Sequence, residues 1–533
     1  MQKGTKRNLF VAATYALVLF MGILLGQNYN VQNRQNQPVA TPILPIATQE
    51  HASKVQRTLD LISGNYVDSV DLDSLQHAII SEMISRLDPH SDYLPPEDAR
   101  QNSQELEGSF EGIGVEFYLL HDTILVVGMV PNGPAQVAGL KVGDQILAID
   151  DEPIAGVQVS TSKLEKLIKG RKGSVMVATV DRVGTEEPFP LEIVRDHYEV
   201  SSIDAGYMLT SNVAYIRISN FGSQTVQDVR QRIESLRKRG ATNVLLDLRG
   251  NKGGYLSAGI DLAGLFLPDG SPVVYTEGTH DPRTTYTARN GGHFIDMGLV
   301  VLIDENSASA SEIVAGAIQD YNRGTIIGRR SFGKGVIQER FGLGDGSVLN
   351  LTVARYYTPL GRSIQRPQVS NQGLDSGQFM VVQGGIRPDI EVQVDETEQN
   401  PLYQMIYRQG LLHEFVYGRL TSGVPAFAIE NYLKGYFLPD QEFEEFIDFV
   451  EERGMDVGPI KKRGSAETET SEHSLKGRMS AEIEALLARY YFGSDAYFKT
   501  KNRRDPVINA ALAHLEAKEA VEQMAIPLQN KVD

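Results

Sequence analysis

The sequence contains no cysteine, which removes several kinds of chemistry before any motif is considered. A thiol nucleophile, a disulfide framework and thiolate metal sites are all excluded. Histidine is also scarce, with 10 residues in the chain, and the H-E-x-x-H pattern of zinc proteases does not occur. We therefore expect no metal site and no cofactor.

Positive charge is in deficit, with 51 Lys and Arg against 68 Asp and Glu and a formal net charge of −17. Binding to a phosphate backbone needs clustered Lys and Arg, and no basic stripe interleaved with aromatic residues is present. We therefore expect no nucleic-acid partner. The 533 residues exceed what one hydrophobic core supports, so about three domains are expected.

A long uncharged hydrophobic run occupies residues 9–26, behind Lys3, Lys6 and Arg7. As a helix it would be roughly 27 Å long, close to the ~30 Å hydrocarbon core of a bilayer. Cations before the run keep the N-terminus cytoplasmic and send the rest of the chain across. Residues 1–26 are thus a signal anchor or a cleaved signal peptide, and we favour the anchor because no clear A-x-A site follows.

Patterns along the rest of the chain predict a multidomain protein with α/β and β parts. Residues 27–50 are rich in Gln, Asn and Pro and form a linker, and apolar residues at helical spacing predict a helical region over 51–99. Alternating strands mark a compact β unit over 100–190. In 191–395, continuous apolar strands alternate with helices, which predicts a sheet covered on both faces. We interpret 396–533 as a solvated helical extension without chemistry.

The most informative stretch is VLIDENSASASEIVAGAIQD (301–320), in which a buried strand passes through a polar turn into an amphipathic helix. Open α/β sheets place ligands at the carboxyl ends of strands, and a helix N-terminus offers N–H groups to developing negative charge. Ser309 lies at this point. Ser309 and Glu312 also fit a capping box, so the local pattern leaves Ser309 as either a helix cap or a nucleophile.

Twenty-five residues later, RRSFGKGVIQERF (329–341) places Lys334 between two glycines ahead of a strand. In an extended segment, the side chains of Lys334 and Gln338 point to one face. A lysine accepts a serine proton only when its surroundings lower its pKa, and a neighbouring amide can orient the amine without holding it protonated. A solvated loop lysine is the alternative.

A third stretch, VLLDLRGNKGGYLSAG (244–259), has the form of a strand, a glycine-rich turn and a helix start. Such a turn can present backbone N–H groups as half of an oxyanion hole. A phosphate-binding loop is the rival interpretation. It is disfavoured because G-x-x-x-x-G-K-[ST] is absent and the turn lacks the spacing of G-x-G-x-x-G.

These stretches, together with LDPHSDYL (87–94) and GIRPDIEV (385–392), resemble the signature of the tail-specific, or carboxyl-terminal processing, proteases in content and order. The resemblance covers residues from about 50 to 395. It implies an α/β Ser/Lys protease core of the ClpP/crotonase-like type. Lys252 stands where proline is common in the family, but the glycines beside it remain.

The resemblance also implies roles for individual residues. Ser309 would be the nucleophile, Lys334 the general base and Gln338 the residue that orients the lysine. The oxyanion would be held by the backbone N–H of Ala310 and of one glycine of the adjacent pair in the glycine-rich turn, for which we choose Gly254.

The unit at 100–190 resembles a PDZ domain inserted before the protease core. Gly112, Ile113, Gly114 and Val115 match the loop that binds a peptide carboxylate, and the strand that follows would pair with the peptide. The resemblance implies protein or peptide substrates with free C-termini, captured by their tails and cut nearby. It also suggests an adaptor protein as a further partner.

We therefore expect a serine endopeptidase of the bacterial cell envelope, anchored in the inner membrane by its N-terminal helix and facing the periplasm. If the signal is cleaved, the enzyme would be secreted to the periplasm. A penicillin-binding protein or β-lactamase is disfavoured because no K-T-G follows the S-x-x-K of Ser331 and Lys334. A catalytically silent PDZ scaffold that only binds peptides is the alternative from another functional class.

Overall fold

The computed structural model describes residues 49–120, 122–289, 291–367, 384–394, 396–421, 433–435, 437–458 and 475–525. The chain divides into two units: one runs up to Tyr93 and includes Arg340–Leu343 and Val348–Asn350, and the other holds the rest. The hydrophobic run at 9–26, expected to be a membrane helix, lies outside the described residues. Within the described part, no helix is both long and apolar enough to span a bilayer.

Among its described residues, the first unit contains two helices, α2 (Gln49–Asn65) and α3 (Leu72–Ser85). Helix α3 begins at a proper cap, because the carboxylate of Asp71 accepts hydrogen bonds from the backbone N–H groups of Asp73 and Ser74. The strand β1 (Asp92–Leu94) then pairs with the start of β18 (Val348–Tyr357).

The second unit contains an antiparallel sheet with the strand order β3-β4-β5-β7-β8 and a short β6 beside β5. Its buried core includes Ile124, Ile146, Met176 and Ile193, under the helices α5 and α6. The bounds are β3 (Val115–Leu120), β4 (Thr123–Met129), α5 (Pro134–Ala138), β5 (Gln145–Ile149), β6 (Glu152–Pro153), α6 (Thr161–Ile168), β7 (Val175–Asp181) and β8 (Phe189–Val194). A ribbon of β2 (Ser109–Gly112) and β9 (Asp196–Glu199) flanks this sheet in the sequence, after α4 (Pro96–Glu107).

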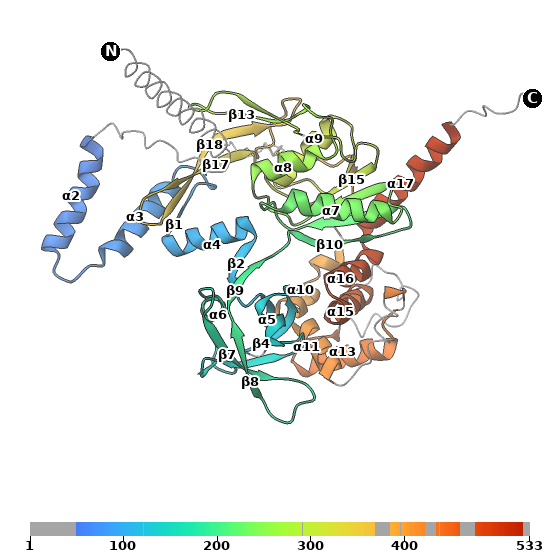
Figure 1. Ribbon diagram of the computed structural model, residues 1–533, viewed down its shortest axis with the longest axis horizontal. Coiled ribbons are helices and arrows are strands. Elements are labelled where there is room, and N and C mark those ends of the chain that lie inside the picture. The colour runs from blue at the N-terminus through green and yellow to red at the C-terminus, as the bar shows by residue number, and fades with distance from the viewer. Residues whose placement is uncertain are drawn as a thin grey trace, which may run out of the picture. The chain divides into compact units, whose positions relative to one another are not determined.

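A second sheet has the order β10-β11-β12-β15-β16-β19, in which β10 is antiparallel to β11 and the other pairs are parallel. Its strands are β10 (Ile203–Met208), β11 (Val213–Ile218), β12 (Asn243–Asp247), β15 (Gly298–Ile303), β16 (Thr325–Gly328) and β19 (Ile390–Glu391). The connecting helices are α7 (Thr225–Lys238), α8 (Leu256–Gly264) and α9 (Ala310–Asp320) (Figure 1). The strands β13 (Pro272–Glu277), β14 (Thr284–Thr287) and β17 (Val336–Gly342) belong to the sheet of β18.

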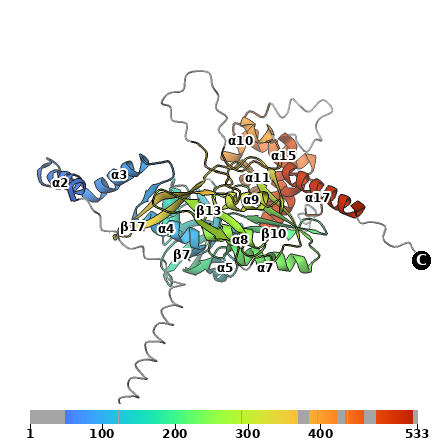
Figure 2. The same cartoon turned by 90° about the horizontal axis from the view of Figure 1, so that it is seen from above.

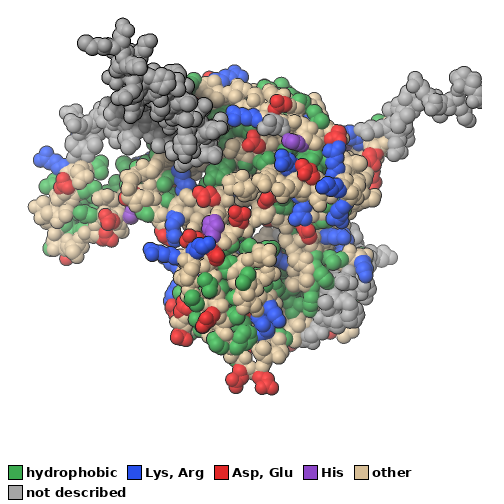
Figure 3. Space-filling model, in the orientation of Figure 1, with side chains coloured by type: hydrophobic (Ala, Val, Ile, Leu, Met, Phe, Trp, Pro, Cys, Tyr) green, Lys and Arg blue, Asp and Glu red, His purple; other side chains and the backbone are tan. Residues whose placement is uncertain are grey.

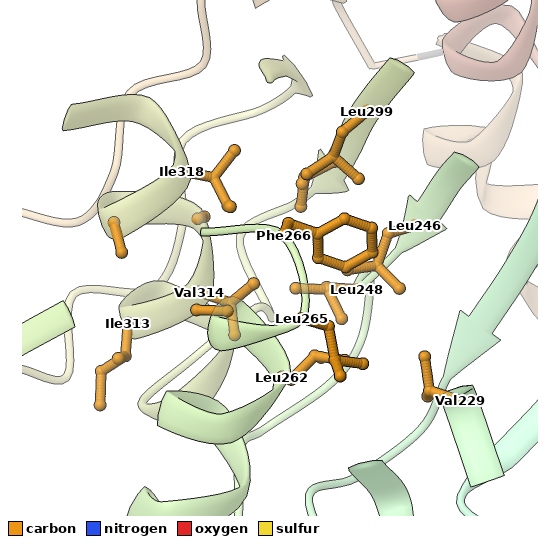
Figure 4. Packing of buried hydrophobic residues seen from close by; sticks show 14 of the residues in the cluster. Val229, Leu246, Leu248, Leu262, Leu265, Phe266, Leu299, Ile313, Val314 and Ile318 are labelled. Atoms are coloured by element: carbon orange, nitrogen blue, oxygen red, sulfur yellow. The ribbon is translucent and has the colours of Figure 1, made fainter. Parts of the chain in front are cut away.

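Successive side chains of the parallel strands enter two different cores, as the pleat requires. Leu246 and Leu299 point to the side of α7, α8 and α9, where they gather with Phe266 and lie near Val314 of α9 (Figure 4). Leu245, one residue earlier, points to the opposite side. The expectation of a sheet covered on both faces is therefore confirmed.

The opposite face is covered by the helix α17 (Pro506–Ala525), so that β10 lies between α7 and α17 in Figure 2. Val507, Ile508, Ala511 and Leu515 of α17 pack on strand residues such as Val300. The expectation that the whole C-terminal part is a solvated extension is wrong for this helix. Its apolar side chains complete the core of the parallel sheet.

The other C-terminal helices share a core of their own, in which Ile406, Phe446 and Ile483 are buried. In the described part of the chain these helices are α10 (Pro401–Arg408), α11 (Leu411–Thr421), α13 (Asp440–Glu452), α15 (Leu475–Phe492) and α16 (Ser494–Lys501). On the face that Figure 3 shows, Lys and Arg side chains of the described residues lie intermixed with Asp and Glu. The described residues also form exposed ion pairs, such as that of Arg237 with Asp296.

Candidate active site

Ser309 lies where the chain leaves β15 and enters α9, and its backbone is strained. Its φ is +56° and its ψ is −115°, whereas a helix N-cap residue is normally extended. A non-glycine residue held this way costs about 1–3 kcal/mol and is found mostly at functional sites. The turn that imposes this conformation is fixed by Ser307, whose hydroxyl donates to the carbonyl of Leu248 (2.8 Å). Simple helix capping would not require this strain.

The carboxylate of Glu312, fully buried in the first turn of α9, connects Ser309 to the segment that carries Lys334. It accepts hydrogen bonds from the backbone N–H of Ser309 (2.9 Å), Gly333 (2.7 Å) and Lys334 (2.9 Å), and from the hydroxyl of Ser331 (2.6 Å). Burial raises the pKa of Glu312, although these donors favour its charged form. The glutamate of the expected capping box is therefore also the link between the two candidate catalytic residues.

The side chains of Lys334 and Gln338 meet at the start of β17. The amine of Lys334 donates to the amide oxygen of Gln338 over 2.7 Å, and both residues are half-buried. The glycines beside Lys334 allow the close packing of this loop. A Cβ on Gly333, whose φ is +91°, would come within 3.1 Å of the backbone nitrogen of Gly385, and one on Gly335 would meet the backbone nitrogen of Gln365 at 2.5 Å.

A second bridge between Ser309 and Lys334 comes from Tyr356 of β18. Its buried hydroxyl lies within hydrogen-bond distance of the backbone carbonyl of Ser309 (3.1 Å) and of that of Lys334. The single O–H can donate to one carbonyl at a time. Burial raises the pKa of Tyr356 well above its usual value, so the group stays protonated and can serve as this donor.

The glycine-rich turn lies beside Ser309. A Cβ on Gly253, whose φ is +100°, would be only 2.7 Å from the Cβ of Ser309 and 3.2 Å from the backbone nitrogen of Ala310. The N–H of Gly253 donates to the side chain of Asn251 (2.8 Å), so it is not available to an oxyanion. Gly254 is the other glycine of the pair, and within the described part of the chain its N–H has no protein acceptor. This geometry favours Gly254 as the donor.

Asn251 holds this turn in place from inside the core. Its amide nitrogen donates to the carbonyl of Ile218, and its own backbone carbonyl accepts from Ala308 (2.9 Å) and from the hydroxyl of Ser311 (3.0 Å). The turn that precedes Ser309 and the glycine-rich turn are therefore bonded directly to each other.

A buried ion cluster lies beneath the same turn. Asp247, at the end of β12, pairs with Arg249 (2.7 Å) and Arg217 (3.1 Å) and accepts from Tyr215. Burial alone would raise the pKa of Asp247, but the two guanidinium charges outweigh it and hold the pKa far below its usual value. Arg249 also pairs with Asp505 (2.7 Å), so this cluster connects the turn to the start of α17.

The four residues of the expected carboxylate-binding loop occupy the end of β2 and the start of β3. Gly114 has a φ of +69°, and a Cβ placed on it would lie 3.4 Å from the ring of Tyr198. Ile113 is buried, and its carbonyl accepts from the N–H of Ala135. β3, which begins at Val115, is at one end of its sheet, and among the described residues no strand pairs with its outer edge. An extended peptide can add at such an edge.

The family follows from comparison with known proteins. Residues 212–392 match the sequence model of peptidase family S41, and residues 112–193 match that of the PDZ domain. A carboxy-terminal-processing protease of Bartonella bacilliformis is 32% identical over 405 residues, which are 75% of this chain and 86% of that protein. This chain belongs to peptidase family S41. The resemblance to carboxyl-terminal processing proteases and the PDZ domain are thereby confirmed.

Other members of the family are similar to a comparable extent. The carboxy-terminal processing protease CtpB of Bacillus subtilis is 32% identical over 362 residues, which cover 67% of this chain and 75% of that protein. Among solved structures, a photosystem II D1 C-terminal processing protease is 26% identical, covers 64% of this chain and 87% of its own, and has a TM-score of 0.36.

Three residues of the candidate site were not assigned a role from the sequence. The spacing of Glu312 from Ser309 indicated a capping box, but nothing in the sequence indicated its hydrogen bonds to the loop of Lys334. The position of Asn251, a polar residue within a glycine-rich turn, was a weak indication of a role in the site. No sequence pattern indicated a role for Tyr356. Among the described residues, no group of three or more His, Asp and Glu is placed to hold a metal ion.

Proposed function

We propose that this S41 peptidase is a serine endopeptidase in which Ser309 is the nucleophile and Lys334 the general base. The observation that carries the proposal is the direct connection of the two residues through Glu312 and Tyr356. These bonds bring a strained serine at a strand end and a half-buried lysine into one small region. The lysine amine contacts the neutral amide of Gln338, which does not hold it protonated as a carboxylate would.

In the proposed reaction, the uncharged amine of Lys334 takes the proton of the Ser309 hydroxyl as its oxygen attacks the peptide carbonyl. The negative charge that develops on the carbonyl oxygen is held by the backbone N–H of Ala310 and of Gly254. The C–N bond then breaks and the leaving amine takes the proton from Lys334. Water attacks the resulting ester by the same route and releases the new carboxylate and Ser309.

We propose further that the PDZ domain selects substrates by their free C-termini, so that cleavage falls near the tail. The loop of Gly112, Ile113, Gly114 and Val115 would receive the carboxylate, and the open edge of β3 would pair with the peptide. We place the enzyme in the bacterial cell envelope, tethered to the inner membrane by residues 9–26, with periplasmic proteins as substrates. A cleaved signal, which would release the enzyme to the periplasm, is the alternative, and an adaptor protein is a further proposed partner.

The test of the catalytic pair uses the full-length chain in an uncharged detergent and an unfolded protein substrate. Wild type should cleave it, whereas Ser309→Ala and Lys334→Met should not. Lys252→Met is the matched control, because it removes a lysine of the neighbouring turn that has no proposed role, and it should cleave like wild type. Cleavage that survives both catalytic substitutions would contradict the mechanism.

The test of tail recognition compares peptide substrates that differ only in a free or an amidated C-terminus. Amidation removes the carboxylate and should raise KM strongly. Equal cleavage of the two peptides would contradict recognition by the PDZ loop. Binding of the free peptide without cleavage by any form of the chain would favour the catalytically silent scaffold.

The membrane tether has a separate test. Extraction of bacterial membranes with alkaline carbonate should leave the chain in the pellet, and its intact mass should include residues 1–26. A shorter soluble form would show a cleaved signal instead.

A further inference from the structure

A cavity of about 440 Å³ lies at the carboxyl ends of the parallel strands, on the side covered by the C-terminal helices. Arg217, Arg249 and Asp304 form its floor, and residues of α15, α16 and the start of α17 form its roof. Its volume is within the range of small-molecule sites. None of the residues proposed for catalysis or for PDZ recognition lines it.

The wall of the cavity is strongly asymmetric in charge. Among the described residues that line it, seven are Arg or Lys and three are Asp or Glu. Each of the three acids already has partners. Glu482 pairs with Lys501, Asp505 pairs with Arg249, and Asp304 accepts from backbone N–H groups such as that of Gly250. Within the lining itself, basic side chains therefore outnumber acidic ones.

Three of the arginines are held in place from outside the cavity. Arg329 pairs with Glu305 (2.7 Å), Arg489 with Glu116 (2.5 Å) and Arg504 with Glu484 (3.1 Å), and none of these carboxylates is part of the lining. A guanidinium has five N–H donors and one carboxylate engages at most two of them, so a paired arginine can bind a second anion. Side chains fixed in advance lose less entropy when a ligand arrives.

The three arginines also reach the cavity from different elements: Arg329 follows β16, Arg489 is in α15, and Arg504 lies just before α17. The rings of Tyr497 and Phe498 form a further part of the wall. Donors that converge from separate directions suit a ligand with more than one oxyanion group.

We propose that this cavity is a binding site for a small molecule that carries two or more phosphate or carboxylate groups, recognised by Arg329, Arg489 and Arg504. The inference goes beyond the proposed proteolysis, in which no step uses the cavity. It can therefore be tested by binding alone.

The experiment is calorimetric titration of the full-length chain, in an uncharged detergent, with pyrophosphate and separately with citrate. The ionic strength is kept constant with KCl, because salt screens weak charge attraction. The variants are Arg329→Ala and Arg489→Ala, because the carboxylates that pair with these arginines are exposed to solvent. Arg504→Ala is not used, because it would leave the buried carboxylate of Glu484 without its arginine partner. Arg237→Ala, which breaks an exposed ion pair away from the cavity, is the matched control.

Saturable binding to wild type is expected, and each cavity variant should weaken it about tenfold or more, the loss of one charge-assisted hydrogen bond. Arg237→Ala should bind like wild type. Binding of pyrophosphate alone would assign phosphate ligands, and binding of citrate alone would assign carboxylates. The proposal is overturned if neither anion binds wild type saturably at millimolar concentration, or if Arg237→Ala weakens binding as much as the cavity variants do. Circular dichroism checks that each variant is folded. If a variant unfolds, the wild-type titration still tests the proposal.

Discussion

At the scale of single residues, the candidate site depends on groups that do not take part in the proposed chemistry. Glu312 and Tyr356 each form hydrogen bonds with backbone groups of both Ser309 and Lys334, and so hold the two segments together. Such a positioning role suits groups whose protonation state stays the same, and burial keeps Tyr356 protonated. Two substitutions test these contacts separately.

The substitution Glu312→Gln should lower kcat about 100-fold, the typical effect of displacing a catalytic group by about 1 Å. The carboxylate oxygens of Glu312 accept four hydrogen bonds. In the variant, the side-chain amide nitrogen of glutamine replaces one of these oxygens and would face N–H or O–H donors, which it cannot accept from. Peptide-cleavage kinetics measure the effect, with KM expected to change little. Glu305→Gln, an exposed carboxylate two residues after β15, is the control and should leave kcat unchanged. Equal kcat for Glu312→Gln and wild type would contradict the positioning role.

The substitution Tyr356→Phe keeps the buried ring and removes only the hydroxyl. Loss of one hydrogen bond between neutral groups should lower kcat by about three- to tenfold. Denaturant unfolding of wild type and variant should show that the free energy of unfolding falls by about 1 kcal/mol. If only stability falls and kcat is unchanged, the hydroxyl is structural and does not position the site.

At the scale of elements, the C-terminal helices are joined by buried charge as well as by apolar packing. Lys501 of α16 lies between Glu482 of α15 (3.1 Å) and the hydroxyl of Tyr497 (3.0 Å). Burial would raise the pKa of Glu482, but the charge of Lys501 and hydrogen bonds from Tyr497 and Lys501 outweigh it, so the pKa is lowered. For Lys501, burial opposes the charged form, but Glu482 outweighs it and the pKa is raised.

These directions predict how Glu482→Gln changes stability with pH. A carboxyl with a lowered pKa stabilises the folded state above its unfolded pKa of about 4.5, and loses this effect as the pH falls. The variant should therefore be about 1.5–3 kcal/mol less stable at pH 7, the usual cost of losing a charge-assisted hydrogen bond, because solvent reaches the 34% exposed side chain of Lys501; the deficit should shrink in acid. Because the pKa of Lys501 is raised, the pair should remain intact up to strongly alkaline pH.

Urea unfolding at a series of pH values measures this deficit. Glu444→Gln makes the same chemical change on an exposed position of α13 and should cost little at any pH. A deficit for Glu482→Gln that is the same in acid and at neutral pH would rule out the ion pair as its source.

At the scale of the whole molecule, α17 makes the parallel sheet dependent on the last part of the described chain. Ile508 is 1% exposed in the core of this face, although more than 200 residues separate it from Leu245 and Val300 in the sequence. The ion pair of Arg249 with Asp505 at the start of the helix adds a polar connection to the glycine-rich turn. Helix α17 is therefore a component of the core of the parallel sheet and not an attachment to it.

The substitution Ile508→Ala should destabilise the protease core by about 2–5 kcal/mol, because it leaves a cavity between α17 and the sheet. Val521→Ala, at a 65% exposed position of the same helix, should have little effect. Denaturant unfolding of the two variants provides the comparison. Equal and small losses would mean that α17 packs only loosely on the sheet.

The sequence by itself determined the identity and order of the site motifs. Ser309, Lys334 and Gln338 could be proposed from local patterns and from family resemblance, because a strand end, a helix start and a glycine turn are properties of neighbouring residues. The pattern of continuous apolar strands alternating with helices likewise indicated a sheet with two covered faces. It did not indicate what covers the second face, because the apolar face of an amphipathic helix does not specify the surface on which it packs.

Only the tertiary structure decided which groups meet. Three of the four hydrogen bonds to Glu312 exist because the loop of residues 331–334 folds back onto α9, and Tyr356 reaches Ser309 from a strand 47 residues away. The cationic cavity likewise forms only where strand ends meet helices from far along the chain. Hydrogen bonds and burial depend on distance in space, which local sequence patterns do not encode.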